Sequence, residues 1–550
     1  MRVFQGSAAV KPLELWQEVT ASSPAIVGVD TETPSLSDRS LLGLGLAFGQ
    51  GRNFYITADD DDFPRALRVL RDPAVTKVFH NAPFDVRLLR KYQVDYSNIQ
   101  DTAIMVRLLG EANATLEAHS WRVRLQTTPA TQLMAEYKAK DMTQIPPEAV
   151  GAKCCRDAEA TLELYHKLHN EVDHALYDVD IRVVTMLETI SQKGLALDHP
   201  LLDEVTVYYK QMADYYKTLT AGYGFSVSSP WQVGYTLATR GNFLPLTKSG
   251  KQLATDDATL SELDDPLAAV VLLYRKYAKM LNTYLVPWAD QPRAYTTFHL
   301  DAITGRISGT SAGANEPDRN MLNLPKKSEM ADVEAGRVKP VRHVLLPDKG
   351  EFTKGDASQI ELRLLSHLSG DERMERVLRN PDGDIHSDTN DGMEIHNRYI
   401  AKVFNFAMIY LANDKTLARQ IKTRDYERVA EYRRRWMSTY PGAAAWMERS
   451  QVDGLRDGYA HTLFGRKMPI PLDMGEAHAR SCSVNFIIQG SAADIFKRML
   501  LVMTPWLDMI RLPVHDELLL DGCANVPIEE LARVSPVWTP VKVEHQRRWE

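Results

Sequence analysis

Cysteine is scarce in this sequence of 550 residues. The four cysteines are Cys154, Cys155, Cys482 and Cys523. They form no C-x-x-C pair and no zinc-ligand spacing, which argues against a disulfide framework and fits a reducing compartment. We expect all four to be ordinary core residues.

Long hydrophobic runs are missing as well. No segment approaches the roughly 18 consecutive apolar residues that a membrane span needs. The first segment, MRVFQGSAAVKPLELW, has no basic stretch followed by an apolar run of signal-peptide length. We therefore expect a protein without membrane contact, located in the cytoplasm.

The chain has no excess of positive charge, since its formal net charge is −7. Local clusters of Lys and Arg, rather than a positive total, are what a phosphate-bearing partner requires. Such clusters occur at 274–284 and 419–435. Each run by itself is more typical of a solvated helix face, so these runs give supporting evidence only.

The length predicts about three or four domains of roughly 150 residues each. The first ~170 residues alternate short apolar runs with helical patterns, which favours an α/β unit. Long amphipathic helices dominate 178–288, and the remainder mixes short strands with helices. In the remainder we predict helices over 358–368, 398–410, 423–439 and 480–503.

A first group of acids lies in the α/β unit. In AIVGVDTE an apolar strand ends with Asp30 and Glu32, whose side chains share one face because strand side chains repeat every two residues. Asp85 opens a predicted helix in NAPFDVRLL, and Asp157 lies on a later helix. Four carboxylates from separate segments can converge as ligands of two divalent ions. We interpret the neighbouring His80 as a structural hydrogen-bonding residue.

These acids resemble the four motif residues of the DEDD 3′→5′ exonucleases. The resemblance implies a ribonuclease H-like domain that trims a 3′-terminal nucleotide, with Asp30, Glu32, Asp85 and Asp157 as catalytic metal ligands. One ion would lower the pKa of a water molecule, and the other would stabilise the leaving 3′ oxygen. The sequence departs from the family at Lys153, where a Tyr or His usually orients the attacking water and where a Lys offers no acceptor.

A second group of acids comes from two distant segments. In EFTKGDASQIELRLLSHL an extended stretch delivers Asp356 to the start of a helix with apolar residues at helical spacing. In RLPVHDELLLDG two apolar arms flank His515, Asp516 and Glu517, which predicts a tight hairpin with the acids at its tip.

Between these segments, Arg398, Lys402, Phe406 and Tyr410 recur every four residues. On a helix that advances about 100° per residue they form a slowly drifting stripe. By itself this pattern is more typical of an amphipathic core helix with charged residues at its edge. Beside two acidic segments it favours a surface along which a nucleotide lies.

Together these segments resemble motifs A, B and C of family A DNA polymerases, of the DNA polymerase I type, over nearly the whole chain. Motif A is DASQIELR (356–363), motif B is RYIAKVFNFAMIY (398–410) and motif C is HDE (515–517). Further matches are TGRIS (304–308), NMLNLP (320–325), TLFGR (462–466) and NFIIQGSAAD (485–494). The resemblance implies an α/β multidomain protein, with the exonuclease domain followed by a right-hand polymerase of thumb, palm and fingers.

The resemblance also implies roles for single residues. The catalytic polymerase set is Asp356, Asp516, Glu517 and Lys402, in which Asp356 and Asp516 bind metal. The nucleotide-binding set is Arg398, Lys402, Phe406, Tyr410, Glu361, Gln359 and His386. The DNA-binding set is Arg306, Asn323, Asn485, Gln489 and His515. Glu361 would close the space that a ribose 2′-hydroxyl needs, which favours DNA synthesis over RNA synthesis. The sequence departs from the motifs at three positions. Ala357 stands where an aromatic residue is frequent, Leu322 where Gln is expected and Leu411 where Gly is usual.

We predict an exonuclease domain over 1–172, a helical thumb region over 173–295, and a palm over 296–550 with fingers at about 372–450. The expected cofactors are two Mg²⁺ ions in each active site, with Mn²⁺ as a substitute. The expected partners are primer-template DNA and dNTPs, with a helicase, primase or single-strand-binding protein as accessory factors, and the expected state is a monomer. We expect a complete, phage-like chain without a 5′-nuclease domain, in the host cytoplasm if it comes from a phage.

Two alternatives stay open at this point. A single-subunit RNA polymerase would share the polymerising chemistry, although Glu361 and the exonuclease motifs oppose it. A nucleic-acid-binding protein with a weakened exonuclease is the other, although the full set of acids opposes it.

Overall fold

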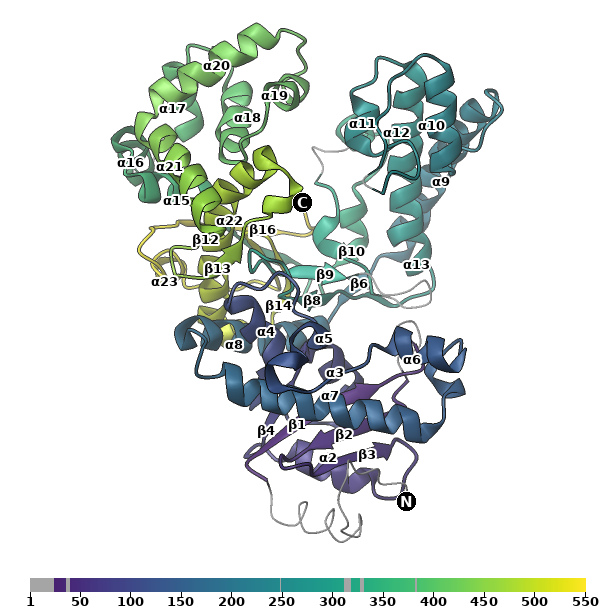
Figure 1. The fold of residues 1–550 in the computed structure, drawn as a ribbon. Helices are drawn as coiled ribbons and strands as arrows, with labels where there is room; N and C mark the ends of the chain where they lie inside the picture. The colour runs from purple at the N-terminus through teal and green to yellow at the C-terminus, as the bar shows by residue number, and fades with distance from the viewer. Residues whose placement is uncertain (1–23, 36–39, 248, 311–317, 327–330, 381–382) are drawn as a thin grey trace.

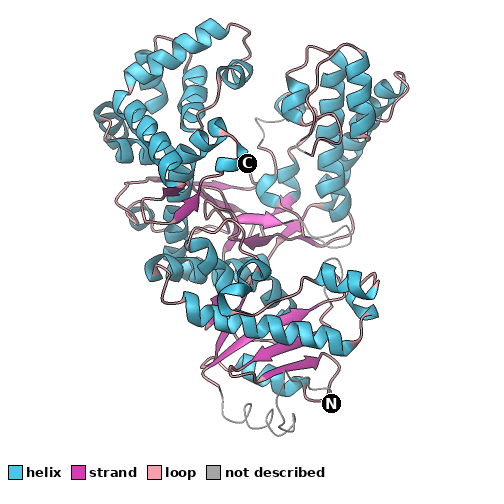
Figure 2. Cartoon of the chain, in the orientation of Figure 1, coloured by secondary structure: helices cyan, strands magenta, loops and turns pink. Residues whose placement is uncertain are grey.

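The computed structural model describes residues 24–35, 40–247, 249–310, 318–326, 331–380 and 383–550. They form a lower lobe that contains the first sheet and two upper helical lobes that flank a second sheet (Figure 1). Strands are confined to the lower lobe and to the region between the upper lobes, as Figure 2 shows. No helix within the described ranges is both long and apolar enough to cross a bilayer. The N-terminal segment used for the localisation prediction lies outside the described residues.

The lower lobe contains a sheet with strand order β3-β2-β1-β4-β5. Its strands are β1 (Ile26–Glu32), β2 (Gly43–Ala47), β3 (Asn53–Thr57), β4 (Thr76–Phe79) and β5 (Ile99–Asp101). β1 pairs antiparallel with β2 and parallel with β4. Its helices include α2 (Phe63–Arg71), α3 (Ala82–Leu89), α4 (Thr102–Leu108), α5 (Leu116–His119), α6 (Ala130–Tyr137) and α7 (Pro147–Leu168).

Helix α7 crosses the sheet at unusually close range, and two glycines make this possible. A Cβ atom at Gly28 would lie 2.4 Å from the carbonyl oxygen of Ala158. A Cβ atom at Gly45 would lie 2.8 Å from the carbonyl oxygen of Cys154. Since no side chain separates strand and helix, acids at the end of β1 come within reach of acids on α7.

The right-hand upper lobe is a helical arm with its own small core. It contains α9 (His199–Ala221), α10 (Pro230–Thr239), α11 (Asp257–Ser261) and α12 (Pro266–Met280). Helices α9 and α12 pack along each other at the base of the arm. The separate apolar cluster is Val227, Val233, Leu237, Leu244, Leu260, Leu267, Ala268 and Val271. The long helices expected over 178–288 are therefore confirmed.

A four-stranded antiparallel sheet of order β14-β15-β11-β16 lies between the upper lobes. Its strands are β11 (Phe352–Ala357), β14 (Ile510–Val514), β15 (Glu517–Asp521) and β16 (Val541–Gln546). The predicted hairpin is confirmed: β14 and β15 are joined by His515 and Asp516, and His515 adopts a left-handed φ of 58°. Asp356 on β11 pairs in register with Glu517 on β15.

The left-hand upper lobe is built from helices. They are α15 (Ile360–Ser369), α16 (Glu372–Arg379), α17 (Ile385–Gly392), α18 (Arg398–Ile409), α19 (Asp414–Gln420), α20 (Tyr426–Thr439) and α21 (Pro441–Asp457). Helix α22 (Glu476–Val502) runs from this lobe beneath the sheet. The four helices predicted in this half of the chain are confirmed as α15, α18, α20 and α22, with ends that shift by up to a turn.

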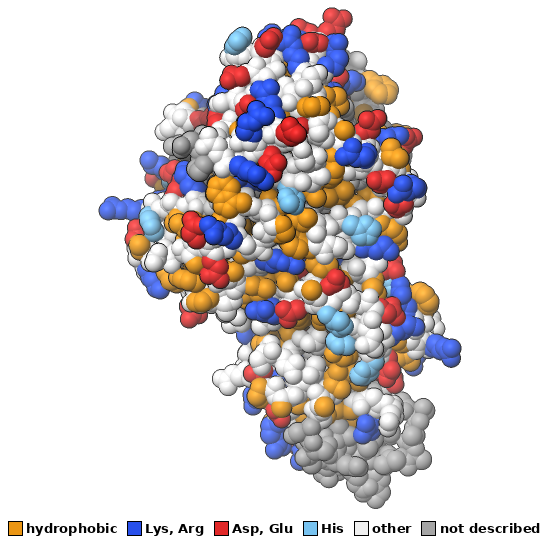
Figure 3. Space-filling view, turned by 90° about the vertical axis from the view of Figure 1, so that its left-hand side faces the viewer, with side chains coloured by type: hydrophobic (Ala, Val, Ile, Leu, Met, Phe, Trp, Pro, Cys, Tyr) orange, Lys and Arg blue, Asp and Glu red, His pale blue; other side chains and the backbone are white. Residues whose placement is uncertain are grey.

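The arginines at the end of the basic run at 419–435 pair with acids of the same lobe. Arg433 pairs with Asp414 at 2.8 Å, and Arg435 pairs with Glu431 at 2.9 Å. Figure 3, which views the molecule from the left-hand side of Figure 1, shows Lys and Arg interspersed with Asp and Glu. On that face the charges do not form a single basic patch.

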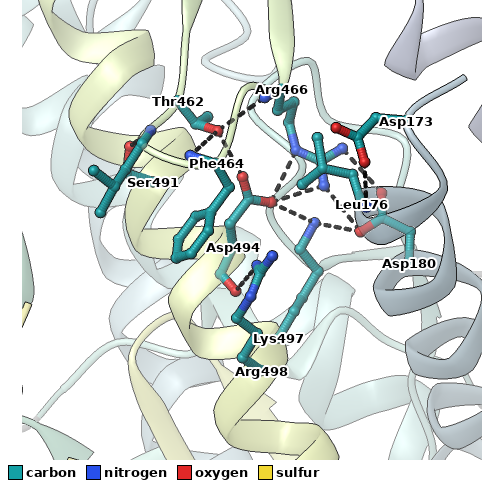
Figure 4. A network of polar contacts seen from close by, with 11 residues as sticks. Asp173, Leu176, Asp180, Thr462, Phe464, Arg466, Ser491, Asp494, Lys497 and Arg498 are labelled. Atoms are coloured by element: carbon teal, nitrogen blue, oxygen red, sulfur yellow. Dashed lines mark hydrogen bonds and ion pairs between the residues drawn. The ribbon is translucent and has the colours of Figure 1, made fainter. Parts of the chain in front are cut away.

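Helix α8 (His174–Ser191) connects the lower lobe to the rest of the chain, and Asp180 in its first half belongs to a buried network of charges (Figure 4). Arg466 contacts Asp180 at 2.9 Å and Asp494 at 2.7 Å, and Lys497 contacts Asp180 at 2.6 Å. Each of these side chains is at most 4% exposed. The network joins α8, α22 and the loop before β13 (Lys467–Pro469), and a Cβ atom at Gly305 would lie 2.9 Å from the guanidinium group.

The cysteine prediction is only partly correct. Cys154, Cys155 and Cys482 are buried, but Cys523 is exposed. Cys523 follows the end of β15 in a turn, where the chain leaves the sheet and meets solvent.

Candidate active sites

A pocket of about 990 Å³ opens in the lower lobe, and all four acids of the first group line it. Asp30 and Glu32 come from the end of β1, Asp85 from the first turn of α3 and Asp157 from the middle of α7. The structure therefore brings together four acids that come from three separate segments of the sequence. Lys153 lines the same pocket.

Lys153 is the central contact of this acidic cluster. Its Nζ donates to Glu32 Oε1 at 2.7 Å and to Asp157 Oδ2 at 2.8 Å. Thr31 donates its hydroxyl to Asp85 Oδ1 at 2.6 Å. Two buried carboxylate oxygens, Asp30 Oδ2 and Asp157 Oδ1, have no hydrogen-bond partner among the described residues.

Burial dominates the electrostatics of the pocket. It raises the pKa of Asp30 well above its usual value, with the attraction of Lys153 acting against it, and it raises the pKa of Asp85 to about 7. Burial acts to lower the pKa of Lys153, but the surrounding carboxylates, led by Glu32, outweigh it and raise that pKa well above its usual value. Carboxylates that are buried together in this way are stabilised by a cation.

The donor set fits a hard divalent cation. The ligand atoms of Asp30, Glu32 and Cys154 lie within 4.8 Å of one another. Burial raises the pKa of the Cys154 thiol well above its usual value, so that it stays protonated and is a poor ligand. The remaining donors are carboxylate oxygens, which suit magnesium or manganese.

His80 confirms the structural interpretation. Its Nε2 donates to the carbonyl oxygen of Ala114 at 2.7 Å, and its Nδ1 lies 2.8 Å from the hydroxyl oxygen of Thr102. Both ring nitrogens are therefore engaged by the protein, which leaves neither available to a metal ion.

A second pocket, of about 600 Å³, lies between the four-stranded sheet and the left-hand upper lobe. Most of the residues implied by the polymerase resemblance line it. They are Arg306, Asp356, Gln359, Glu361, His386, Arg398, Lys402, Phe406, Tyr410, His515 and Asp516. Residues that are more than 200 positions apart in the sequence thus face one cavity.

Asp356 lies near the end of β11, and Asp516 lies in the turn before β15, the strand that pairs with β11; both line this pocket. The backbone nitrogen of Ala357 donates to the carbonyl oxygen of Asp516 at 2.9 Å, which fixes the hairpin tip against the end of β11. Burial raises the pKa of both carboxyl groups, and the charge of Asp516 adds to the rise for Asp356. The pair therefore fits a divalent cation.

Helix α18 forms the opposite wall. Its four stripe residues, Arg398, Lys402, Phe406 and Tyr410, all line the pocket, although Tyr410 lies just beyond the last helical residue. Arg398 pairs with Asp384 at 2.5 and 3.0 Å. His386 is buried, its Nδ1 accepts a hydrogen bond of 2.9 Å from Asn405, and burial lowers its pKa to about 4.

Glu361 is held by two other pocket residues. Its Oε1 pairs with Arg306 at 2.6 Å, and Tyr410 donates its hydroxyl at 3.1 Å. The three side chains therefore form a connected unit that lines the pocket.

Four implied residues do not line this pocket. Glu517 is buried and accepts a hydrogen bond of 2.7 Å from the indole nitrogen of Trp549. Asn323 lines a separate pocket near α12. Asn485 and Gln489 lie on α22, where Gln489 hydrogen bonds the hydroxyl of Tyr410.

Sequence reasoning missed one charged residue that lines the pocket and one that pairs with a residue lining it. Lys326 lines it and lowers the pKa of both Asp356 and Asp516, against the larger effect of burial. Its position directly after the NMLNLP match was an available signal. Asp384 was missed because only contact with Arg398 shows its importance.

Leu411 occupies a position where Gly is usual in the motif, and its φ is 47°. A left-handed conformation costs an L-residue roughly 1–2 kcal/mol. The structure thus shows why Gly is suited to this position.

Paired carboxylates opposite a helix with cationic side chains are the arrangement of enzymes that transfer or hydrolyse phosphate esters with divalent ions. Residues 201–545 match the model of DNA polymerase family A, and residues 8–173 match a 3′-5′ exonuclease model. The chain belongs to DNA polymerase family A. The expected fold of an exonuclease domain followed by a polymerase domain is confirmed.

The curated relatives are bacterial DNA polymerases I. The enzyme of Pseudomonas aeruginosa is 28% identical over 90% of this chain, and that of Chloroflexus aurantiacus is 28% identical over 96%. This chain spans 59% and 61% of their respective lengths. A solved structure, the POL domain of Pol1 from M. smegmatis in complex with DNA primer-template and dNTP, matches with a TM-score of 0.75 at 21% identity, covering 98% of this chain and 99% of that one.

Proposed function

We propose that this chain is a DNA-directed DNA polymerase that also removes nucleotides from a 3′ end. The observation that carries the polymerase assignment is the single pocket shared by Asp356, Asp516 and the cationic end of α18. Membership of family A supports it, as does the primer-template and dNTP named for the M. smegmatis structure. We propose the same two substrates for this chain.

Asp356 and Asp516 are proposed to hold two Mg²⁺ ions, because both carboxyl groups are half-buried and repel each other. Bound there, the ions would lower the pKa of the primer 3′-hydroxyl and neutralise the leaving pyrophosphate. Glu517 lies behind this pair and is anchored by Trp549, so its proposed role is to keep the hairpin tip in position.

The residues of α18 are proposed to bind the incoming nucleotide along the helix. Lys402 and Arg398 would contact the triphosphate, which requires Arg398 to exchange Asp384 for phosphate oxygens. Phe406 and Tyr410 would face the sugar and the base, with Gln359 and His386 on the adjoining walls. Glu361, held by Arg306 and Tyr410, would exclude a ribose 2′-hydroxyl.

Binding of the primer-template is proposed for five residues: Arg306, Asn323, Asn485, Gln489 and His515. Arg306 pairs with Glu361, and Gln489 hydrogen bonds the hydroxyl of Tyr410. Recognition of minor-groove acceptors that all correct base pairs share would thus be connected to the shape of the nucleotide pocket.

The pocket of the lower lobe is proposed to hydrolyse the terminal phosphodiester bond of a DNA strand. Its four carboxylates would hold a divalent cation near the scissile phosphate. Proofreading follows if the same 3′ end reaches both pockets in turn.

The test is primer extension and 3′ trimming by three proteins: wild type, Asp516→Ala, and Asp30→Ala with Glu32→Ala. Asp516→Ala should lose extension and keep trimming, while the double variant should do the reverse. Loss of both activities in both variants, with folding intact, would refute the assignment of two separate sites.

The choice of DNA over RNA synthesis is tested at Glu361. Wild type should incorporate dNTPs and reject rNTPs, and Glu361→Ala should raise rNTP incorporation. Efficient rNTP use by wild type, without dNTP use, would favour the RNA polymerase alternative instead.

A further inference from the structure

Lys153 is a buried residue of the acidic pocket rather than a surface lysine, with its side chain 11% exposed. It precedes Asp157 by one turn of α7, so both side chains lie on the face of the helix that meets β1. The close approach of α7 to the sheet places the ammonium group between acids of the two elements. Its two carboxylate contacts, at 2.7 and 2.8 Å, have the length of charge-assisted hydrogen bonds.

The ammonium group and a metal ion compete for the same oxygens. Mg²⁺ binds oxygen at roughly 2.0–2.1 Å and requires close to octahedral geometry. Glu32 Oε1 and Asp157 Oδ2 already contact Lys153 Nζ, so an ion that bridged these two oxygens would displace the ammonium group. Two cations bound to the same pair of oxygens would also repel each other strongly.

Two other carboxylate oxygens of the pocket are available to an ion. Asp30 Oδ2 and Asp157 Oδ1 are buried and have no hydrogen-bond partner among the described residues. Asp85 Oδ1, by contrast, accepts a hydrogen bond of 2.6 Å from the hydroxyl of Thr31. A buried oxygen without a partner is costly, and a bound cation removes that cost.

We propose that this pocket binds one divalent cation, through Asp30 and Asp157, and that the Lys153 ammonium takes the place of a second one. The proposal rests on the exonuclease function proposed above. It differs from the expectation of two ions in each active site, because a lysine replaces the water-orienting residue at this position. Lys153 is thus a fixed positive charge that positions Glu32 and Asp157.

The test counts Mn²⁺ ions bound to the full chain. Asp356→Asn with Asp516→Asn first removes the ligands of the polymerase pocket, and electron paramagnetic resonance of free Mn²⁺ then gives the number bound. In this background we expect one bound ion per chain. Adding Asp30→Asn and Glu32→Gln should abolish it, which identifies the ion with the pocket.

Lys153 is then replaced in the same background. Lys153→Met keeps the length of the side chain without its charge and should raise the count from one to two, whereas Lys153→Arg keeps the charge and should leave it at one. The proposal would be overturned if the background protein that keeps Lys153 bound two ions or no ion. It would also be overturned if a folded Lys153→Met variant bound no second ion. The number of Mn²⁺ ions bound to the background protein that keeps Lys153 tests the proposal even if the Lys153→Met variant does not fold.

A trimming assay separates this inference from the proposed function. One bound ion without 3′ trimming would refute the exonuclease assignment and leave the ion count intact. Trimming with two bound ions would support the exonuclease assignment and refute the inference.

Discussion

Asp180 makes the buried charge network of Figure 4 testable by a single substitution. The network contains two acids and two bases, so it is neutral, and burial is almost complete for each member. Burial acts to raise the pKa of Asp180, but Arg466 and Lys497 outweigh it and lower that pKa. Asp180→Asn would leave one acid for two cations, a net charge of +1 in the interior.

Removing one partner of a buried ion pair costs about 3–5 kcal/mol. At about 2 °C per kcal/mol for a large domain, this corresponds to a fall in the unfolding temperature of about 6–10 °C. Thermal unfolding followed by circular dichroism at neutral pH measures it.

Asp178→Asn is the matched control. Asp178 lies on the same helix, but its ion pair with Arg182, at 3.4 Å, is exposed to solvent. Exposed pairs contribute about 0–1 kcal/mol, so this variant should unfold close to wild type. Adding Lys497→Met to Asp180→Asn restores neutrality and should recover part of the loss. Equal unfolding temperatures for Asp178→Asn and Asp180→Asn would refute the reasoning, as would further destabilisation by Lys497→Met.

Three other predictions concern the polymerase half. Trp549→Phe removes the donor to buried Glu517, which should cost about 1–3 kcal/mol of unfolding free energy in urea denaturation; an unchanged midpoint would contradict it. Burial lowers the pKa of His386 to about 4, so its ring should stay neutral at pH 6 in NMR titration, and its contribution to stability should be lost as pH falls from about 6.5 towards 4; protonation at pH 6 would show the ring to be solvated. Arg424 and Asp264 pair at 2.9 Å across the two upper lobes, but both side chains are more than 80% exposed. Asp264→Asn should therefore change the free energy of unfolding by less than about 0.5 kcal/mol. A larger loss would show that this pair holds the lobes together.

The sequence alone was sufficient for the elements that carry the acids. Short apolar runs predicted the strand that ends with Glu32 and the hairpin around Asp516, and four-residue spacing predicted the helix from Arg398. Such patterns are local, because the repeat of a strand or helix is visible within one turn or a few residues. The acids could therefore be assigned to elements, and the motifs to a family, before any contact was known.

Contacts between distant residues could not be predicted in this way. Asp384 pairs with Arg398, Trp549 holds Glu517, and Asp180 neutralises Arg466 across 286 positions of sequence. None of these pairs has a periodic signal, and each depends on how separate elements pack. The exposed position of Cys523 likewise depends on where the chain leaves the sheet.

Lys153 shows the division between the two sources of information. The sequence determined that a lysine stands where a water-orienting residue is usual, and that its charge lies one helical turn from Asp157. Only the tertiary structure decided what that charge does, because glycines at positions 28 and 45 let α7 approach β1 closely enough for one ammonium group to contact acids of both elements. Sequence spacing fixes which residues share an element, whereas the distance between elements depends on packing across the whole domain.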